Sequence, residues 1–283
     1  RNGLPLMTRF AANSIIKNVM KKITMFLYSI IAYLIAFASI LFWIASVSGL
    51  IPEISIDREP TLPPLMAILN NLLLITLFGV QHSVMARKWF KDFFTHYFPK
   101  PVERSTFVLV SGLLLFNLVF QWQPLGGVIW AISPESPLYY ITYVCFFLGW
   151  AILFISSFLI NHFDLFGLRH TFLELRNKPY TELKFRISAF YKYVRHPLYF
   201  GMLLGMWATP NMTLTHLAFA VAISIYVVIG TYFEERDLVR AFGQKYRSYQ
   251  ARIPMLLPIP KWKKTNGGIS GQQSGVRNQN TYS

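Results

Sequence analysis

The chain has 283 residues, of which 54% are hydrophobic and only 14% are charged, whereas about 25% of a typical soluble domain is charged. This composition argues against a soluble enzyme. The 27 Lys and Arg residues against 12 Asp and Glu would suggest nucleic-acid binding in a soluble protein. Aromatic-rich apolar runs separate the basic clusters, however, and this pattern is typical of a protein in a lipid bilayer.

Five stretches contain no Asp, Glu, Lys or Arg, and each exceeds the roughly 20 residues that cross the hydrocarbon core. They are residues 23–52, 60–86, 105–134, 136–163 and 196–233. The last stretch can cross twice, and Pro210-Asn211 in its middle predicts the bend of a helical hairpin. We therefore expect an all-α integral membrane protein with four transmembrane helices and a C-terminal helical hairpin, in total five to six membrane segments. The hairpin either spans the bilayer fully or is re-entrant.

The positions of the basic residues predict the orientation. If the N-terminus is inside, every Lys and Arg except Arg58 falls on one side, and basic loops prefer the cytoplasm. Both termini are then cytoplasmic, and the net charge of +15 reports topology, so that we expect no nucleic-acid partner. We predict a basic N-terminal segment at 1–22, a single transmembrane domain at 23–260 and a disordered tail at 261–283.

The second uncharged stretch ends with three polar side chains, Gln81, His82 and Arg87. Polar groups are costly in or next to lipid and often have a function. Two interpretations stay open. The three residues either form hydrogen bonds between helices, with the arginine reaching the headgroups, or they line a polar cavity.

The fourth stretch ends with Asn161, His162 and Asp164, and Arg169 and His170 follow closely. These residues either terminate a helix and anchor it to lipid headgroups, or they supply a general base from His162 or Asp164. The two histidines are eight residues apart, and no cysteine is near them. This spacing matches no common metal motif, so we expect no metal.

A third polar group opens the hairpin, with Tyr193 and Arg195-His196-Pro197 leading to Tyr199. Proline suits the first turn of a helix, and the free N–H groups of such a turn attract a carboxylate. The side chains of Arg195 and His196 would add positive charge there. Gly201 and Gly205, spaced four apart, would let another helix or a flat ligand approach the backbone closely.

Two adjacent acids, Glu234 and Glu235, follow the last uncharged stretch, where we expect the second arm of the hairpin to end. Acids at a helix C-terminus oppose its macrodipole. This mismatch favours a ligand cation or an arginine partner. The two ends of one hairpin thus present a cationic pair and an anionic pair, which suits a zwitterion with an additional positive charge.

The order of these residues forms a recognisable signature within residues 190–260. It reads Arg195-His196-Pro197-x-Tyr199-x-Gly201, an apolar hairpin, Glu234-Glu235, and Phe242-Gly243-x-x-Tyr246-x-x-Tyr249 with Pro254 and Pro258. This closely resembles the C-terminal signature of the isoprenylcysteine carboxyl methyltransferase superfamily, whose members are integral membrane enzymes that use S-adenosylmethionine.

The upstream groups narrow the resemblance. Gln81-His82-Ser83 with Arg87, and the segment from Asn161 to Arg169, look like those of the bacterial membrane methanethiol S-methyltransferases and, more distantly, of the NnrU proteins of denitrification. The resemblance implies methylation of a small thiol, most simply methanethiol to dimethyl sulfide, with S-adenosylmethionine as donor and release of S-adenosylhomocysteine. It also implies a bacterial inner-membrane location, with the active site opening to the cytoplasm.

On this basis we assign roles to the polar residues. Asp164, His162 and Arg195 are the catalytic candidates, and Gln81, His82 and Arg87 would close the substrate side. The residues expected to bind S-adenosylmethionine are Tyr193, His196, Pro197, Tyr199, Gly201, Glu234, Glu235 and Tyr246. Two alternatives stay open: methylation of an isoprenylcysteine carboxylate or another lipid-borne acceptor, and a non-enzymatic NnrU-like membrane protein or transporter. The sequence does not predict an oligomeric state.

Overall fold

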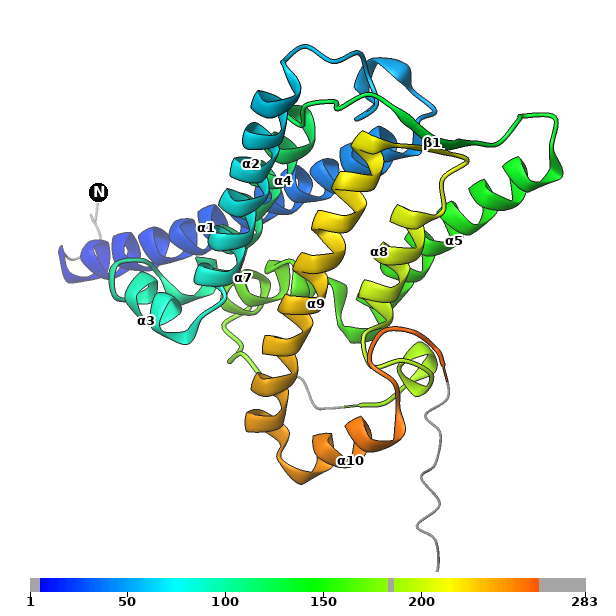
Figure 1. The fold of residues 1–283 in the computed structure, drawn as a ribbon. Helices are drawn as coiled ribbons and strands as arrows, with labels where there is room; N and C mark the ends of the chain where they lie inside the picture. The colour runs from blue at the N-terminus through cyan, green and yellow to red at the C-terminus, as the bar shows by residue number, and fades with distance from the viewer. Residues whose placement is uncertain (1–5, 183–185, 260–283) are drawn as a thin grey trace, which may run out of the picture.

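The computed structural model describes residues 6–182 and 186–259, and these form an almost entirely helical protein (Figure 1). Within them, five helices are long and apolar enough to cross a membrane. They are α1 (Leu6–Ser48), α2 (Pro64–Met85), α4 (Glu103–Phe120), α5 (Pro137–Ile160) and α9 (Leu214–Phe242). The expected all-α membrane fold, with four spanning helices before a C-terminal hairpin, is confirmed.

The hairpin consists of the short helix α8 (Pro197–Trp207) and α9. At 1.5 Å per residue, α8 is only about 16 Å long, roughly half of a bilayer's hydrocarbon thickness. An extended segment continues it to β2 (Asn211–Thr213), which pairs antiparallel with β1 (Val128–Ala131) of the loop between α4 and α5. The bend of the hairpin therefore lies beside the α4–α5 loop, at the end of the molecule that is uppermost in Figure 1.

Two helices end at positions that differ from the ends of the uncharged stretches, and the expectation for the second hairpin arm is wrong. Helix α4 ends at Phe120, and the rest of the stretch 105–134 is a loop containing β1. Gly126 and Gly127 in that loop have φ of 69° and 66°, which suits glycine and not a helix. The second hairpin arm does not end before the two acids, because α9 continues through good helix formers to Phe242. Gly243, at φ 55°, ends it.

Small residues bring the hairpin against α5. A Cβ atom on Gly149 would lie 2.4 Å from the backbone nitrogen of Gly205, and one on Gly201 would lie 2.5 Å from the carbonyl oxygen of Gly149. Such close approach is how helices pack in lipid, where there is no hydrophobic drive for them to associate. Gly201 and Gly205 therefore serve helix packing, which is one of the two uses expected of them.

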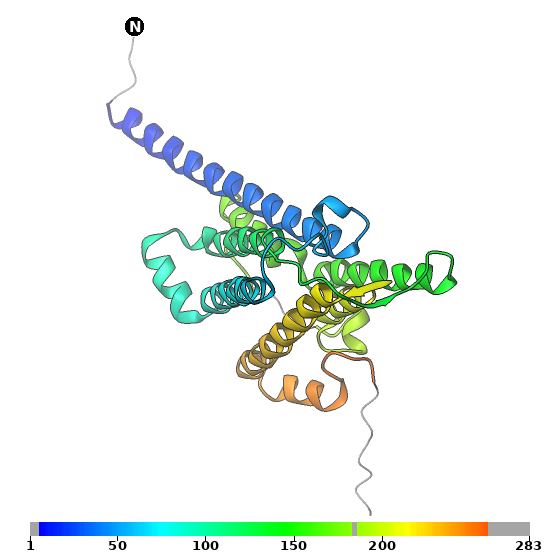
Figure 2. The same ribbon diagram turned by 45° about the horizontal axis from the view of Figure 1, so that its top comes forward.

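The end of the molecule opposite the β1–β2 pair carries the short helices, as the two views of Figures 1 and 2 show. They are α3 (Lys88–Tyr97), α6 (His162–Leu165), α7 (Leu168–Leu175), α10 (Gln244–Arg252) and the 3-10 turns η2 (Lys100–Val102) and η3 (Ala189–Lys192), while a further turn, η1 (Pro52–Ile54), belongs to the other end. The expected boundary after residue 22 falls inside α1. The predicted tail at 261–283 lies outside the described residues.

Candidate active site

A buried ion pair joins the start of α8 to α9. Nε of Arg195 donates to Oε1 of Glu235 at 2.5 Å, and its Nη2 donates to Oε2 at 2.9 Å. The remaining terminal nitrogen donates to the carbonyl oxygens of Gln250 and Ile253. The side chain of Arg195 is 7% exposed and that of Glu235 is 12% exposed. Of the two partners foreseen for the acids, the arginine is the one present.

Further groups surround the same carboxylate. His196 Nε2 lies 3.1 Å from Glu235 Oε1, the amide of Gln250 donates at 2.9 Å, and the hydroxyl of Tyr246 donates at 3.4 Å. We call Arg195, His196, Tyr199, Glu234 and Glu235 the hairpin cluster. Because the carboxylate of Glu235 and the guanidinium of Arg195 are paired within the protein, they connect the start of α8 to α9 and α10.

Glu234 is the open member of the hairpin cluster. Its side chain is 44% exposed, and it accepts a hydrogen bond of 2.9 Å from the hydroxyl of Tyr199. Nδ1 of His196 lies 3.8 Å from the same carboxylate. Glu234 therefore has acceptor capacity left for a cation from outside, whereas Glu235 has little.

Local backbone structure positions this cluster. Pro197 is the first residue of α8, as expected, and is buried. The N–H groups of Arg195 and His196 donate to the carbonyl oxygens of Pro254 and Met255, so that the chain after α10 is tied to the start of α8. Tyr193 is 68% exposed and lines a separate, small apolar cavity of about 80 Å³.

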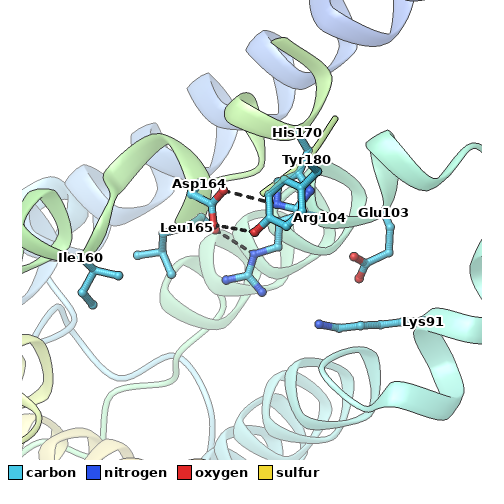
Figure 3. Close-up of a pocket in the computed structure, with 8 residues that line it drawn as sticks. All are labelled: Lys91, Glu103, Arg104, Ile160, Asp164, Leu165, His170 and Tyr180. Carbon is cyan, nitrogen blue, oxygen red and sulfur yellow. Dashed lines mark hydrogen bonds and ion pairs between the residues drawn. The ribbon is translucent and has the colours of Figure 1, made fainter. Parts of the chain in front are cut away.

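A second site is a polar cavity of about 230 Å³ at the same end of the molecule (Figure 3). Side chains from α3, α4, α6, α7 and the following loop converge on it. Its lining residues are Lys91, Glu103, Arg104, Ile160, Asp164, Leu165, His170 and Tyr180. Asp164 is the only residue of the sequence assignment among these eight.

Asp164 is the acceptor of this cavity. Nη1 of Arg169 donates to it at 2.8 Å, the hydroxyl of Tyr180 donates at 3.2 Å, and Nε2 of His170 lies 3.7 Å away. Burial, with Asp164 nearby, raises the pKa of Tyr180 above 10.0, so its hydroxyl stays a donor. Burial lowers the pKa of His170 below 6.5, and the ring is therefore neutral at pH 7.

The turn at Asp164 is specified by its neighbours. The side chain of Asn161 accepts from the N–H of Asp164 and caps α6. Gly167, at φ 84°, has its backbone against Ser105, where a Cβ would lie 2.7 Å from the Ser105 nitrogen. Only glycine suits both the conformation and the space, and the turn is thereby fixed against α4.

Arg104 is the cation of the cavity. Its Nε donates to the carbonyl oxygen of Leu165 at 2.9 Å, and its guanidinium lies 4.9 Å above the ring of Phe107. Lys91 reaches toward it from α3 in Figure 3. Arg104 is also close enough to Glu103, Asp164, Tyr180 and Tyr199 to interact with them electrostatically. Since Tyr199 belongs to the hairpin cluster, the cavity and the cluster are neighbours.

His162 does not line the cavity. The residue is 2% exposed, and its two ring nitrogens lie 2.8 Å from the hydroxyl of Ser157 and 3.1 Å from that of Tyr33. Its ring stacks on Phe158 at 4.2 Å. Burial lowers the pKa of His162 below 6.5. These contacts join α1, α5 and α6, and the base role of His162 stays a prediction.

Gln81, His82 and Arg87 lie at the end of α2 and just after it. Gln81 and His82 form hydrogen bonds of 3.3 and 3.2 Å with the hydroxyl of Ser111, which is the interhelical interpretation. Arg87 lies 3.7 Å from Asp237 and 4.9 Å above the ring of Phe233. The three residues therefore join α2 to α4 and α9, and none lines the 230 Å³ cavity.

Sequence reasoning missed Lys91, Arg104 and Tyr180 as site residues. Arg104 directly precedes an uncharged stretch, and a cation at such a boundary reads as a headgroup anchor. Tyr180 stands in a segment without periodicity. Among the described residues, no group of three or more His, Cys, Asp or Glu side chains is placed to hold a metal ion.

Comparison with known proteins identifies relatives along most of the chain. It is 45% identical to methanethiol S-methyltransferase 1 of Bradyrhizobium diazoefficiens over 245 residues, which cover 86% of this chain and 84% of the relative. It is 40% identical to the methanethiol S-methyltransferase of Mycobacterium tuberculosis over 241 residues, or 85% and 98% of the two chains. Nurim of Rattus norvegicus is 26% identical over 187 residues, or 64% and 71%.

No protein-family profile matches the chain, and no solved structure matches it. The two bacterial relatives nevertheless exceed 30% identity, and the matches cover well over two thirds of this chain and of each relative. The protein belongs to the methanethiol S-methyltransferase family.

Proposed function

We propose that the protein transfers a methyl group from S-adenosylmethionine to methanethiol, which yields dimethyl sulfide and S-adenosylhomocysteine. The observation that carries this proposal is the polar cavity beside the hairpin cluster. Its volume of about 230 Å³ is below the roughly 300–1,000 Å³ of pockets for drug-sized ligands. It therefore suits a small acceptor better than a prenyl chain.

The residues of the hairpin cluster fit the methyl donor's charges. Glu234, with its exposed carboxylate, would accept the ammonium group, and the N–H groups at the start of α8 beside His196 would face the carboxylate. Tyr199 orients Glu234 through its hydroxyl, and Glu235, Arg195 and Tyr246 hold the cluster together from behind. S-adenosylmethionine supplies a methyl group bonded to a positively charged sulfur.

Asp164 is the proposed base for the acceptor. An alkanethiol is mostly protonated at pH 7, since even the cysteine thiol has a pKa of about 8.5. The thiol proton passes toward Asp164 and solvent, and the sulfur lone pair forms the new bond to the methyl carbon. The old bond between that carbon and the sulfonium sulfur breaks, and its electron pair stays on the departing sulfur. Tyr180 and Arg169 hold the Asp164 carboxylate in place.

Arg195 takes a positioning role in this proposal, because its guanidinium donors are directed to Glu235 and to two backbone carbonyls. His162 likewise supports the wall that carries Asp164. Tyr193, Pro197 and Gly201 shape the surroundings of the donor site. We propose that this end of the molecule opens to the cytoplasm of a bacterium from its inner membrane, because the basic residues gather there.

The test is to incubate the full chain, purified into lipid nanodiscs, with S-adenosylmethionine and methanethiol and to assay the headspace for dimethyl sulfide. We expect dimethyl sulfide and S-adenosylhomocysteine in equal amounts, and a raised thermal midpoint with S-adenosylhomocysteine. Glu234→Gln should weaken the binding of S-adenosylhomocysteine about tenfold, as expected for one charge-assisted contact. Glu135→Gln, an exposed loop position, is the matched control.

Two outcomes would contradict the proposal. Methylation of a prenylcysteine but not of methanethiol would assign a lipid-borne acceptor. No dimethyl sulfide and no thermal stabilisation by S-adenosylhomocysteine would leave a membrane protein without this activity.

A further inference from the structure

Arg104 stands out because no described carboxylate touches its guanidinium, although Glu103 and Asp164 act on its charge from beyond ion-pair distance. In the part of the chain that the structure describes, it forms no ion pair within 4.0 Å, and its one hydrogen bond uses Nε. The two terminal nitrogens, which carry most of its donor capacity, are directed into the cavity (Figure 3). A guanidinium in such a position is prepared for an anion that the chain itself does not supply.

The two acids of the same cavity attract Arg104 without contacting it. Asp164 is held by Arg169 and Tyr180 instead. Glu103 lies on the far side, facing Lys91 in Figure 3. Lys91 adds a second cation whose ammonium points toward Arg104. The lining residues are two cations, Lys91 and Arg104, and two acids, Glu103 and Asp164. Because Asp164 is already paired with Arg169, the site as a whole has one positive charge in excess.

We propose that Arg104, assisted by Lys91, binds the acceptor as its thiolate and so determines the ionisation of the substrate. This inference rests on the proposed function, because it assumes that a thiol occupies the cavity. A nearby cation lowers the pKa of a thiol, and a hydrogen bond from a guanidinium would direct a sulfur lone pair. The thiol proton leaves by way of Asp164. The negative thiolate and the positive sulfonium then react to give two neutral thioethers.

The other anion at hand is the carboxylate of S-adenosylmethionine. The start of α8 already offers it free N–H groups and His196. Arg104 stands instead among the residues of the small cavity, with Leu165 and Asp164. A proton acceptor, Asp164, and a cation, Arg104, around a small volume match a neutral group that loses a proton and becomes an anion.

The test compares Arg104→Gln with Arg104→Lys and with Arg240→Gln. Arg240 is 70% exposed and pairs with Asp237 outside the cavity, so it controls for the removal of one guanidinium. Each variant is assayed for dimethyl sulfide production across pH and for S-adenosylhomocysteine affinity by calorimetry. For R104Q we expect kcat/KM for methanethiol to fall about 100-fold near pH 7 and about tenfold or less near pH 9, because the free thiol ionises as pH rises.

R104K, which keeps the charge, should lose about tenfold or less, and R240Q should match the wild-type protein. S-adenosylhomocysteine affinity should stay within about twofold in all three. A pH-independent loss in R104Q, or a loss of S-adenosylhomocysteine affinity of more than about tenfold, would overturn the inference and assign Arg104 to the donor. If R104Q does not fold, Lys91→Gln offers the same pH comparison with a smaller loss.

The failure of this inference is separable from failure of the proposed function. If the wild-type protein produces no dimethyl sulfide, the proposed function itself fails. If the wild-type protein is active and R104Q has the wild-type pH profile, only the role of Arg104 falls.

Discussion

The hairpin cluster and the Asp164 cavity both contain buried charges of opposite sign, but they use them differently. In the hairpin cluster, Arg195 and Glu235 satisfy one another through two hydrogen bonds, and Gln250 and His196 complete the set. In the cavity, Asp164 is satisfied by Arg169, whereas the two terminal nitrogens of Arg104 have no acceptor among the residues that the structure describes. The paired charges of the first site hold three helices together, and the donor nitrogens of Arg104 in the second are available to a ligand.

This difference separates buried charges that stabilise the fold from buried charges that are available to a ligand. A fully paired cluster is expensive to break, because removal of either partner leaves a charge without compensation in a medium of low dielectric. A buried cation with unpaired hydrogen-bond donors has a free-energy cost that binding of an anionic ligand removes. The signature residues that are easiest to see in the sequence thus include those that hold the scaffold, and the reacting groups lie beside them.

The strongest way to break the comparison is Glu235→Gln. It leaves the buried Arg195 without its carboxylate, and loss of one partner of a buried pair costs about 3–5 kcal/mol. We expect the thermal midpoint to fall sharply and the binding of S-adenosylmethionine to be lost with it, since α8, α9 and α10 separate. Thermal unfolding and calorimetry in nanodiscs measure both effects.

Glu135→Gln is the control for this variant, because Glu135 is exposed in the loop before α5. An E235Q protein with an unchanged thermal midpoint and lost binding would mean that Glu235 contacts the donor directly and does not hold the helices together.

A second variant, Asp164→Asn, acts on the cavity alone. We expect S-adenosylhomocysteine affinity to stay nearly intact while turnover falls about 100-fold near pH 7, the usual size of a general-base contribution. The loss should shrink at alkaline pH, where the thiol ionises without help. Rates of dimethyl sulfide formation against pH measure this. The control is Asp92→Asn, because Asp92 is exposed on α3 and pairs with Lys88. A loss of turnover in D164N that is the same at every pH would argue against a base.

The parts of the structure that depend on local composition could be predicted from the sequence. A span must be apolar over its whole length, so the five long helices follow from the distribution of charge. The contact of Arg195 with an acid of α9 followed from two charged pairs at the ends of one hairpin. The helix packing at Gly201 followed from two glycines one turn apart.

The parts that depend on distant contacts could not be predicted. Arg104 donates a hydrogen bond to Leu165, which is 61 positions away in the sequence, and no residue pattern near Arg104 predicts that partner. The β1–β2 pair joins two loops that are each ordinary in composition. His162 is a candidate base because it stands near Asp164 in the sequence, and the sequence did not predict that its ring is directed toward Ser157 and Tyr33.

His162 therefore sharpens the comparison, since it is a satisfied group that adjoins the cavity without lining it. Burial lowers its pKa below the ordinary 6.5, so the unfolded state binds the proton more readily than the folded state. The resulting stability is fully present above pH 6.5 and is lost as the pH falls from there toward the lowered folded pKa.

His162→Gln should cost about 1–2 kcal/mol near pH 7, because buried partners are left unpaired, and should flatten the acid side of the stability profile. Thermal midpoints between about pH 5 and 7 measure it. His96→Gln, an exposed histidine of α3, should leave the profile as it is. A turnover defect in H162Q that exceeds its stability defect, and that vanishes at alkaline pH, would instead move His162 into the cavity as a base.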